Sequence, residues 1–111
     1  MNEAMKQKIE NGEVFLGIEL GSTRIKAVLI DNTYAPIASG GYNWENRLED
    51  GYWTYHLDDV WTGVQTSFRE LAKDVSERYG AALTKVASMG VSAMMHGYLA
   101  FDKEGNQLCP F

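Results

Sequence analysis

The fold is decided by residues 14–30, which read VFLGIELGSTRIKAVLI. The two apolar runs of this stretch are interrupted only by Glu19 and Lys26, and the link between the runs contains Gly21. Two apolar runs joined by a short link with glycine are typical of a β-hairpin. The sequence therefore predicts a strand, a tight turn and a second strand near the start of the chain.

The polar residues of this predicted hairpin suit a phosphate group. Backbone N–H groups at a glycine turn can form a nest for anions, and Gly21 lets a phosphate approach the main chain. Ser22 and Thr23 add hydroxyl donors, and Lys26 adds a positive charge. Glu19 offers the kind of oxygen ligand that Mg²⁺ prefers. On these residues alone, a phosphate and Mg²⁺ site and an ordinary hairpin with a polar tip are equally good interpretations.

Further along the chain, the sequence predicts extended segments on either side of one long helix. Residues 35–44 contain proline and glycines, which favours an edge strand, and residues 46–55 predict a loop. Residues 86–93 are small and apolar, as in a strand buried on both faces, and a strand that follows a helical crossover pairs in parallel. Residues 98–101 and 107–108 predict a strand and the start of its return.

The helix is predicted over residues 57–79, where apolar residues recur three or four positions apart. These apolar residues are Leu57, Val60, Trp61, Val64, Phe68, Leu71, Ala72, Val75 and Tyr79. We expect Trp61 and Phe68 to be part of the core. Gly63 is unfavourable within a helix, and close packing on the sheet would explain its presence.

Met95, His96 and Gly97 follow the strand predicted over 86–93, at the edge where open α/β sheets bind ligands. A histidine at this edge can hydrogen-bond the hydroxyl groups of a sugar, and a glycine beside it leaves room for them. On the residues alone, a purely structural histidine is the more common case. A metal site is not indicated, because no ligand spacing links His96 to His56.

Length and composition predict a single cytoplasmic domain. The chain has 111 residues, of which 45% are hydrophobic and 23% are charged. Its net charge of -5 argues against nucleic acid as a partner. No apolar run is long enough to span a membrane, and residues 1–13 lack the apolar segment of a secretory signal. The single cysteine, Cys109, fits a reducing cytoplasm.

The segment from Glu19 to Lys26 resembles the first phosphate motif of the FGGY carbohydrate kinases. That motif reads acid, any residue, Gly, Thr or Ser twice, any two residues, and then Lys or Arg. The resemblance implies that Gly21, Ser22, Thr23 and Lys26 bind the phosphates of ATP. It also implies that Glu19 binds Mg²⁺ or its waters, although the family's acid is normally Asp.

Residues 90–97 resemble a second family segment, which ends in Met-His-Gly in xylulokinases. The resemblance implies that Met95 and His96 contact a ketopentose and that Gly97 leaves room beside them. The two residues before Met95 differ from the family's usual Gly and Gln. A comparable aromatic loop in the family makes Trp53 a secondary candidate on the substrate side, although packing over a helix end is the more common role of such aromatics.

The resemblance covers residues 14–111 and implies an α/β fold of the ribonuclease-H-like, actin-like ATPase type. We expect a partial domain with a mixed sheet, an N-terminal β-hairpin and one long helix. Residues 1–13 would be a polar N-terminal extension, and residues 14–111 the first part of the N-terminal kinase domain, so that the chain is expected to be truncated. The catalytic base is expected beyond Phe111, so that no catalytic residue is assigned and the chain alone is expected to be inactive.

The implied activity is transfer of a phosphoryl group from MgATP to a ketopentose such as D-xylulose. The implied partners are ATP, Mg²⁺, a small sugar and the rest of the kinase chain, with no nucleic acid and no membrane, and a homodimer stays open. One alternative is a non-catalytic module that binds a sugar or a nucleotide, because Glu19 replaces the family's Asp. Another alternative is an FGGY kinase for a different sugar, such as ribulose, fuculose or gluconate.

Overall fold

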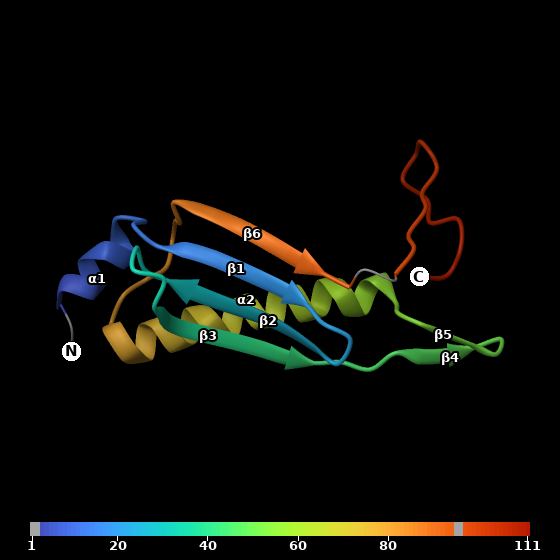
Figure 1. Cartoon of the computed structure of the whole chain (residues 1–111), viewed down its shortest axis with the longest axis horizontal. Helices are drawn as coiled ribbons and strands as arrows, with labels where there is room; N and C mark the ends of the chain where they lie inside the picture. Colours follow the sequence, from blue (N-terminus) through green and yellow to red (C-terminus); the bar gives the residue numbers. More distant parts are fainter. Residues whose placement is uncertain (1–2, 95–96) are drawn as a thin grey trace.

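A four-stranded sheet and one long helix dominate the computed structural model, which describes residues 3–94 and 97–111 (Figure 1). The strands of this sheet are β1 (Phe15–Leu20), β2 (Arg24–Ile30), β3 (Pro36–Asn43) and β6 (Ser88–Ala93). A separate two-stranded sheet consists of β4 (Arg47–Glu49) and β5 (Tyr52–Thr54). The helices are α1 (Glu3–Glu10) and α2 (Leu57–Tyr79). In the part of the chain that is described, no helix is long and apolar enough to cross a membrane.

The strand order of the main sheet is β3-β2-β1-β6, and the sheet is mixed. Strands β1 and β2 pair antiparallel, with Glu19 directly opposite Lys26. Strand β3 pairs antiparallel with β2 and lies at one edge of the sheet, whereas β6 pairs parallel with β1 and lies at the other edge. The predicted hairpin, the predicted edge strand and the parallel pairing after the helix are therefore confirmed.

One face of the sheet packs on α2, which runs along β2 and β3 (Figure 1). The main buried cluster joins apolar residues of the strands, such as Leu16 and Leu29, to Leu71 and Val75 of α2. Ile9 of α1 is also fully buried in this cluster. The opposite face of the sheet carries the exposed Glu19 and Lys26, so the candidate phosphate residues lie away from the core.

The helix predicted over 57–79 is confirmed, and its end has the expected geometry. Gly80 adopts a left-handed conformation with φ 65°, and its N–H donates to the Ser76 carbonyl. The prediction that Trp61 and Phe68 belong to the core was wrong, because their side chains are 60% and 36% exposed. The buried residues of α2 are Val60, Gly63, Ser67, Leu71 and Val75.

Val60, Leu71 and Val75 of the predicted apolar stripe are buried, and small residues explain why Trp61 and Phe68 are not. Gly63 and Ser67 lie on the buried side, and a Cβ at Gly63 would collide with the side chain of Ile25. The Ser67 hydroxyl donates to the Ile25 carbonyl at 3.0 Å. On the strand side, a Cβ at Gly40 would meet the α2 backbone. The helix therefore lies so close to the sheet that only small side chains fit between them, and the larger Trp61 and Phe68 lie outside this contact.

Two substitutions in α2 test this packing. Leu71→Ala is expected to lower the free energy of unfolding by ~2–5 kcal/mol, because a fully buried leucine would leave a cavity. Trp61→Ala is expected to lower it by only about 1 kcal/mol, since most of the Trp61 side chain is already in water. Urea denaturation followed by circular dichroism measures both values. Equal losses at the two positions would contradict the packing described here.

Three other predictions require correction. Strand β6 is not buried on both faces, because all six of its residues are exposed at the edge of the sheet and α2 covers β2 and β3 instead. The loop predicted over residues 46–55 contains β4 and β5. The strands predicted over 98–101 and 107–108 reduce to a single bridge between Phe101 and Gln107. A turn held by the Asp102 carboxylate separates the two bridge residues.

Candidate functional site

The candidate phosphate turn, Gly21-Ser22-Thr23, joins β1 to β2. Two aromatic residues hold it in place by hydrogen bonds to its carbonyl groups. The indole N–H of Trp44 donates to the Gly21 carbonyl at 2.8 Å, and the Trp44 backbone N–H donates to the Thr23 carbonyl at 3.1 Å. The Tyr55 hydroxyl donates to the Ser22 carbonyl at 2.9 Å. All three carbonyls of the turn are thus engaged by the protein, while the side chains of Ser22 and Thr23 are exposed.

Glu19 and Lys26 lie beside this turn on the outer face of the sheet. They are paired across β1 and β2, and both are exposed. A Cβ added at Gly21 would lie 3.6 Å from Glu19 Oε1 and 3.0 Å from the Arg24 carbonyl oxygen. The structure therefore brings the predicted phosphate residues and the predicted metal ligand together at one end of the hairpin.

The chemistry of these residues fits Mg²⁺ bound largely by phosphates and water. Magnesium is commonly held by one or two carboxylates together with the phosphates of a substrate. Glu19 supplies one exposed carboxylate beside the turn. Among residues 3–94 and 97–111, no group of three or more His, Cys, Asp or Glu side chains could hold a metal by itself. The residues fit a metal that arrives with a nucleotide better than a metal bound by the protein alone.

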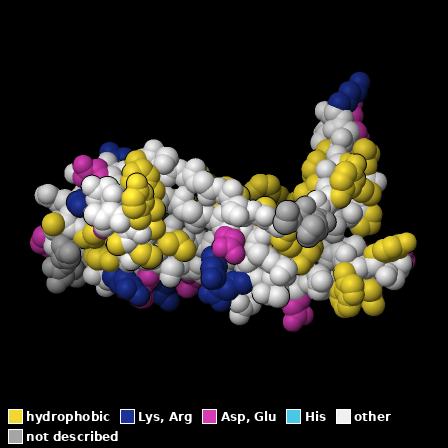
Figure 2. Space-filling model, in the orientation of Figure 1, with side chains coloured by type: hydrophobic (Ala, Val, Ile, Leu, Met, Phe, Trp, Pro, Cys, Tyr) yellow, Lys and Arg dark blue, Asp and Glu magenta, His cyan; other side chains and the backbone are white. Residues whose placement is uncertain are grey.

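A cavity of about 740 Å³ opens next to the turn. Its lining comes from the turn, from β4, β5 and the residues beside them, and from the C-terminal segment. The lining residues are Ser22, Glu49, Asp50, Tyr52, Trp53, Thr54, Tyr55, Met94, Gly97, Tyr98, Pro110 and Phe111. Figure 2 shows hydrophobic side chains gathered on the projecting β4 and β5 strands and on the C-terminal segment, at the end of the molecule away from α1. The cavity thus combines aromatic surfaces with a few polar groups.

Gly97 of the second predicted motif lines this cavity. Met95 and His96 lie outside the described residues, so their predicted contacts with a sugar stay a prediction. Met94 and Gly97, their neighbours on either side, both line the cavity. A Cβ at Gly97 would collide with the ring of Phe111, so glycine is required here for close packing.

The aromatic residues near the turn divide into two roles. Trp44 is buried, and its ring lies 4.5 Å from that of Tyr55, which in turn lies 5.6 Å from the ring of Phe111 (centroid distances). Tyr52 and Trp53 are instead 75% and 67% exposed and line the cavity. The expected packing role holds for Trp44 and Tyr55, whereas Trp53 lies where a ligand could contact it.

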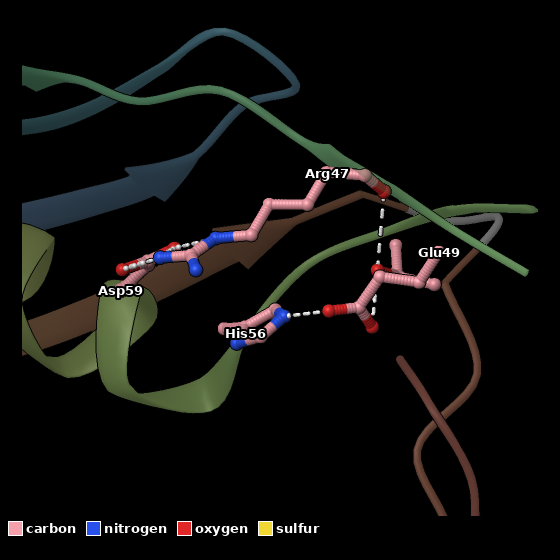
Figure 3. Close-up of polar contacts among 5 residues, drawn as sticks. Arg47, Glu49, His56 and Asp59 are labelled. Carbon is pink, nitrogen blue, oxygen red and sulfur yellow. Dashed lines mark hydrogen bonds and ion pairs between the residues drawn. The ribbon is translucent and has the colours of Figure 1, made fainter.

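Two pairs of polar side chains connect β4 to the start of α2 (Figure 3). The Arg47 guanidinium donates to both carboxylate oxygens of Asp59, with Nη2–Oδ2 at 2.9 Å and Nη2–Oδ1 at 3.1 Å. Glu49 Oε1 lies 2.6 Å from His56 Nε2, and the Thr54 hydroxyl donates to Glu49 Oε2 at 3.3 Å. The hydrogen bond with His56 is the largest of the effects that lower the pKa of the Glu49 carboxyl.

A comparison with protein-family models identifies the family of this chain. Residues 14–111 match the N-terminal domain of the FGGY family of carbohydrate kinases. The chain belongs to this family. A search of curated proteins found no match.

Solved structures of three sugar kinases share the fold. A xyloylose kinase from Brucella ovis has a TM-score of 0.71 and 22% identity, over 87% of this chain and 20% of that chain. A gluconate kinase from Lactobacillus acidophilus has a TM-score of 0.69 and 19% identity, over 87% and 18% of the two chains. A ligand-bound xylulose kinase from Lactobacillus acidophilus has a TM-score of 0.66 and 20% identity, over 87% and 19%. The chain thus spans about a fifth of the length of these kinases, and its fold is the actin-like ATPase type that the sequence predicted.

Two features of this FGGY domain were not predicted from its sequence. The first is the fixing of the turn by Trp44 and Tyr55, for which the sequence carries no local signal because the partners are far apart in the chain. The second is the hairpin formed by β4 and β5. Its signal was present as Asp50-Gly51, a pair typical of two-residue hairpin turns, and these residues have φ 51° and 82°.

Proposed function

We propose that this chain supplies the phosphate-binding turn and part of the sugar site of an ATP-dependent kinase for a ketopentose such as D-xylulose. The observation that carries the proposal is the cavity that joins Ser22 of the turn to Trp53 and to the neighbours of His96. A phosphoryl donor at the turn and a sugar in the cavity would lie side by side. Phosphoryl transfer depends chiefly on such positioning and on neutralisation of charge.

On the donor side, each candidate residue has a distinct role in the proposal. The exposed hydroxyls of Ser22 and Thr23 would hydrogen-bond phosphate oxygens, while Lys26 would neutralise their charge. The N–H of Gly21 donates to the Arg24 carbonyl, so Gly21 would shape the turn and would not bind phosphate itself. Mg²⁺ would be held by Glu19, directly or through water, and when bound it would neutralise charge that develops on the phosphates. Trp44 and Tyr55 would keep the turn in place, since their hydrogen bonds fix its carbonyls.

On the acceptor side, the cavity offers the mixture of surfaces that a sugar needs. The exposed ring of Trp53 can pack against the apolar face of a sugar, and Asp50 lines the same cavity as a hydrogen-bond acceptor. Met95 and His96 are also proposed to contact the sugar. No residue of this chain is proposed as the base that deprotonates the sugar hydroxyl, so we expect the 111-residue chain alone to show no turnover.

A gluconate kinase is the second candidate function. The support for it is the structural likeness to the kinase from Lactobacillus acidophilus, whose TM-score of 0.69 is close to those of the two pentose kinases. A panel of D-xylulose, ribulose, fuculose and gluconate, tested with MgATP on a kinase that contains this domain, distinguishes the candidates. Phosphorylation of gluconate but not of xylulose would overturn the ketopentose proposal.

The substitution Glu19→Asp tests whether the site belongs to an enzyme. Asp is the family's usual acid and is one methylene shorter, so a carboxylate placed for Mg²⁺ moves relative to the turn. We expect Glu19→Asp to change the rate of sugar phosphorylation while the binding of sugar stays the same, because Glu19 lies at the turn and does not line the cavity. Coupled measurement of ADP release gives the rate. No phosphorylation by either form would favour a non-catalytic module that binds sugar or nucleotide.

A further inference from the structure

The hairpin of residues 47–54, which comprises β4, β5 and the turn between them, projects beyond the main sheet (Figure 1). Within the described residues, neither of its strands pairs with a strand of the four-stranded sheet. A single two-stranded hairpin is only marginally stable by itself. The hairpin also carries Trp53, the exposed aromatic residue of the cavity. The position of Trp53 therefore depends on the few contacts that hold the hairpin.

Two side-chain contacts join β4 of this hairpin to the start of α2, one from Arg47 at the base and one from Glu49 next to the turn, and they differ in chemistry (Figure 3). Arg47 and Asp59 form a contact between a guanidinium and both oxygens of a carboxylate. Glu49 Oε1 and His56 Nε2 lie 2.6 Å apart, and the His56 side chain carries a charge only when it is protonated. Glu49 also lines the cavity itself, so the second contact lies directly behind the surface that a ligand would touch.

Several ionisable groups surround His56. They are Arg47 and Glu49 of β4, Tyr55 before α2, Asp58 and Asp59 of α2, and Cys109 of the C-terminal segment. Carboxylates and guanidinium groups ordinarily keep their charge between about pH 6 and 8, whereas thiols ordinarily ionise above about pH 8 and phenols near about pH 10. Histidine side chains gain and lose a proton within this range. Protonation of His56 adds a charge of opposite sign to that of Glu49.

We propose that the Glu49–His56 contact is a positioning contact that holds the 47–54 hairpin, and with it Trp53, against the sugar, and that it holds more tightly when His56 is protonated. This inference rests on the proposed function for the identity of the ligand, but not for the movement of Trp53. Because the contact is partly exposed, its effect is modest. We expect the dissociation constant for D-xylulose to be about threefold higher at pH 7.5 than at pH 6.0.

The test uses nuclear magnetic resonance on a kinase that contains this domain, labelled with ¹⁵N. The indole N–H signal of Trp53, assigned by its loss in Trp53→Phe, is followed from pH 5.5 to 7.5, with and without D-xylulose. The variants are His56→Gln and Glu49→Gln, which remove either side of the contact. The matched control is Glu45→Gln, which removes a carboxylate from the connection before β4. The variant His56→Gln also leaves His96 in place, so it separates the effects of the two histidines.

The proposal expects the Trp53 signal to follow pH in the wild type and in Glu45→Gln, and to stay constant in His56→Gln and Glu49→Gln. It also expects the threefold change in the dissociation constant for xylulose to disappear in His56→Gln. An unaltered pH dependence of the Trp53 signal in His56→Gln would overturn it. If the Trp53 signal behaves as expected but no xylulose binds at any pH, the positioning contact is supported and the sugar of the proposed function is wrong.

Discussion

Gly40→Ala is expected to lower the free energy of unfolding by ~3 kcal/mol or more. A Cβ at Gly40 would meet three backbone atoms of α2, namely the Ser67 carbonyl oxygen, the Leu71 nitrogen and the Glu70 carbonyl carbon. Side chains can change rotamer to relieve a clash, but a helix backbone can only move as a whole. The substitution therefore pushes α2 away from β3 and opens the contact that forms the core. Urea denaturation followed by circular dichroism measures the loss.

A matched control is available in a neighbouring strand. Gly17 lies in β1, and nothing approaches within 4 Å of the position that its Cβ would take. Gly17→Ala should leave the stability unchanged or raise it by ~0.5–1 kcal/mol, since alanine loses less backbone entropy than glycine on folding. A similar loss of stability in both variants would show that the destabilisation at Gly40 reflects strand propensity and not the close approach of α2.

Lys26→Ala is the substitution with the largest expected effect on ligand binding. Lys26 is exposed beside the turn, where the proposal places the phosphates of ATP. A hydrogen bond to a charged group contributes ~1.5–3 kcal/mol, so the dissociation constant for MgATP should rise by at least ~10-fold. Binding of D-xylulose should change by less than about twofold, because Lys26 does not line the cavity. Isothermal titration calorimetry on a kinase that contains this domain measures both constants.

Two further variants give the Lys26 experiment its controls. Lys26→Arg keeps the charge and should retain most of the affinity for MgATP. Lys103→Ala removes the same charge from the exposed turn between the bridge residues Phe101 and Gln107, and should leave both ligands unaffected. Equal weakening of nucleotide and sugar by Lys26→Ala would contradict the separation of the two sites proposed here.

The hairpin of β1 and β2 could be predicted from sequence because its signals are local. Apolar runs, a glycine turn and the Glu19–Lys26 spacing all fall within residues 14–30, and register follows from the turn. Helix α2 could be predicted for the same reason. The exposure of Trp61 and Phe68 could not be predicted, because it depends on Gly40. Gly40 lies on β3 and admits the helix backbone where a larger residue would exclude it.

The candidate site shows the same division between local and distant information. The phosphate residues were found together because they are neighbours in sequence. The contacts of Trp44 and Tyr55 with the turn join residues more than twenty positions apart, and nothing in the local sequence indicates them. The contact of Glu49 with His56 depends on the hairpin between them. The local signal for that hairpin is the Asp50-Gly51 pair, which is typical of two-residue hairpin turns.

The exposed β6 strand has a practical consequence for work with this chain. Its sequence, SMGVSA, contains no charged residue and no proline, and it lies at an open edge of the sheet. Natural sheets commonly protect such edges with lysine, proline or a bulge, because an unprotected edge recruits strands from other molecules. Concentrated solutions of this chain should therefore form β-rich aggregates. The substitution Val91→Lys should keep the protein in solution to a higher concentration.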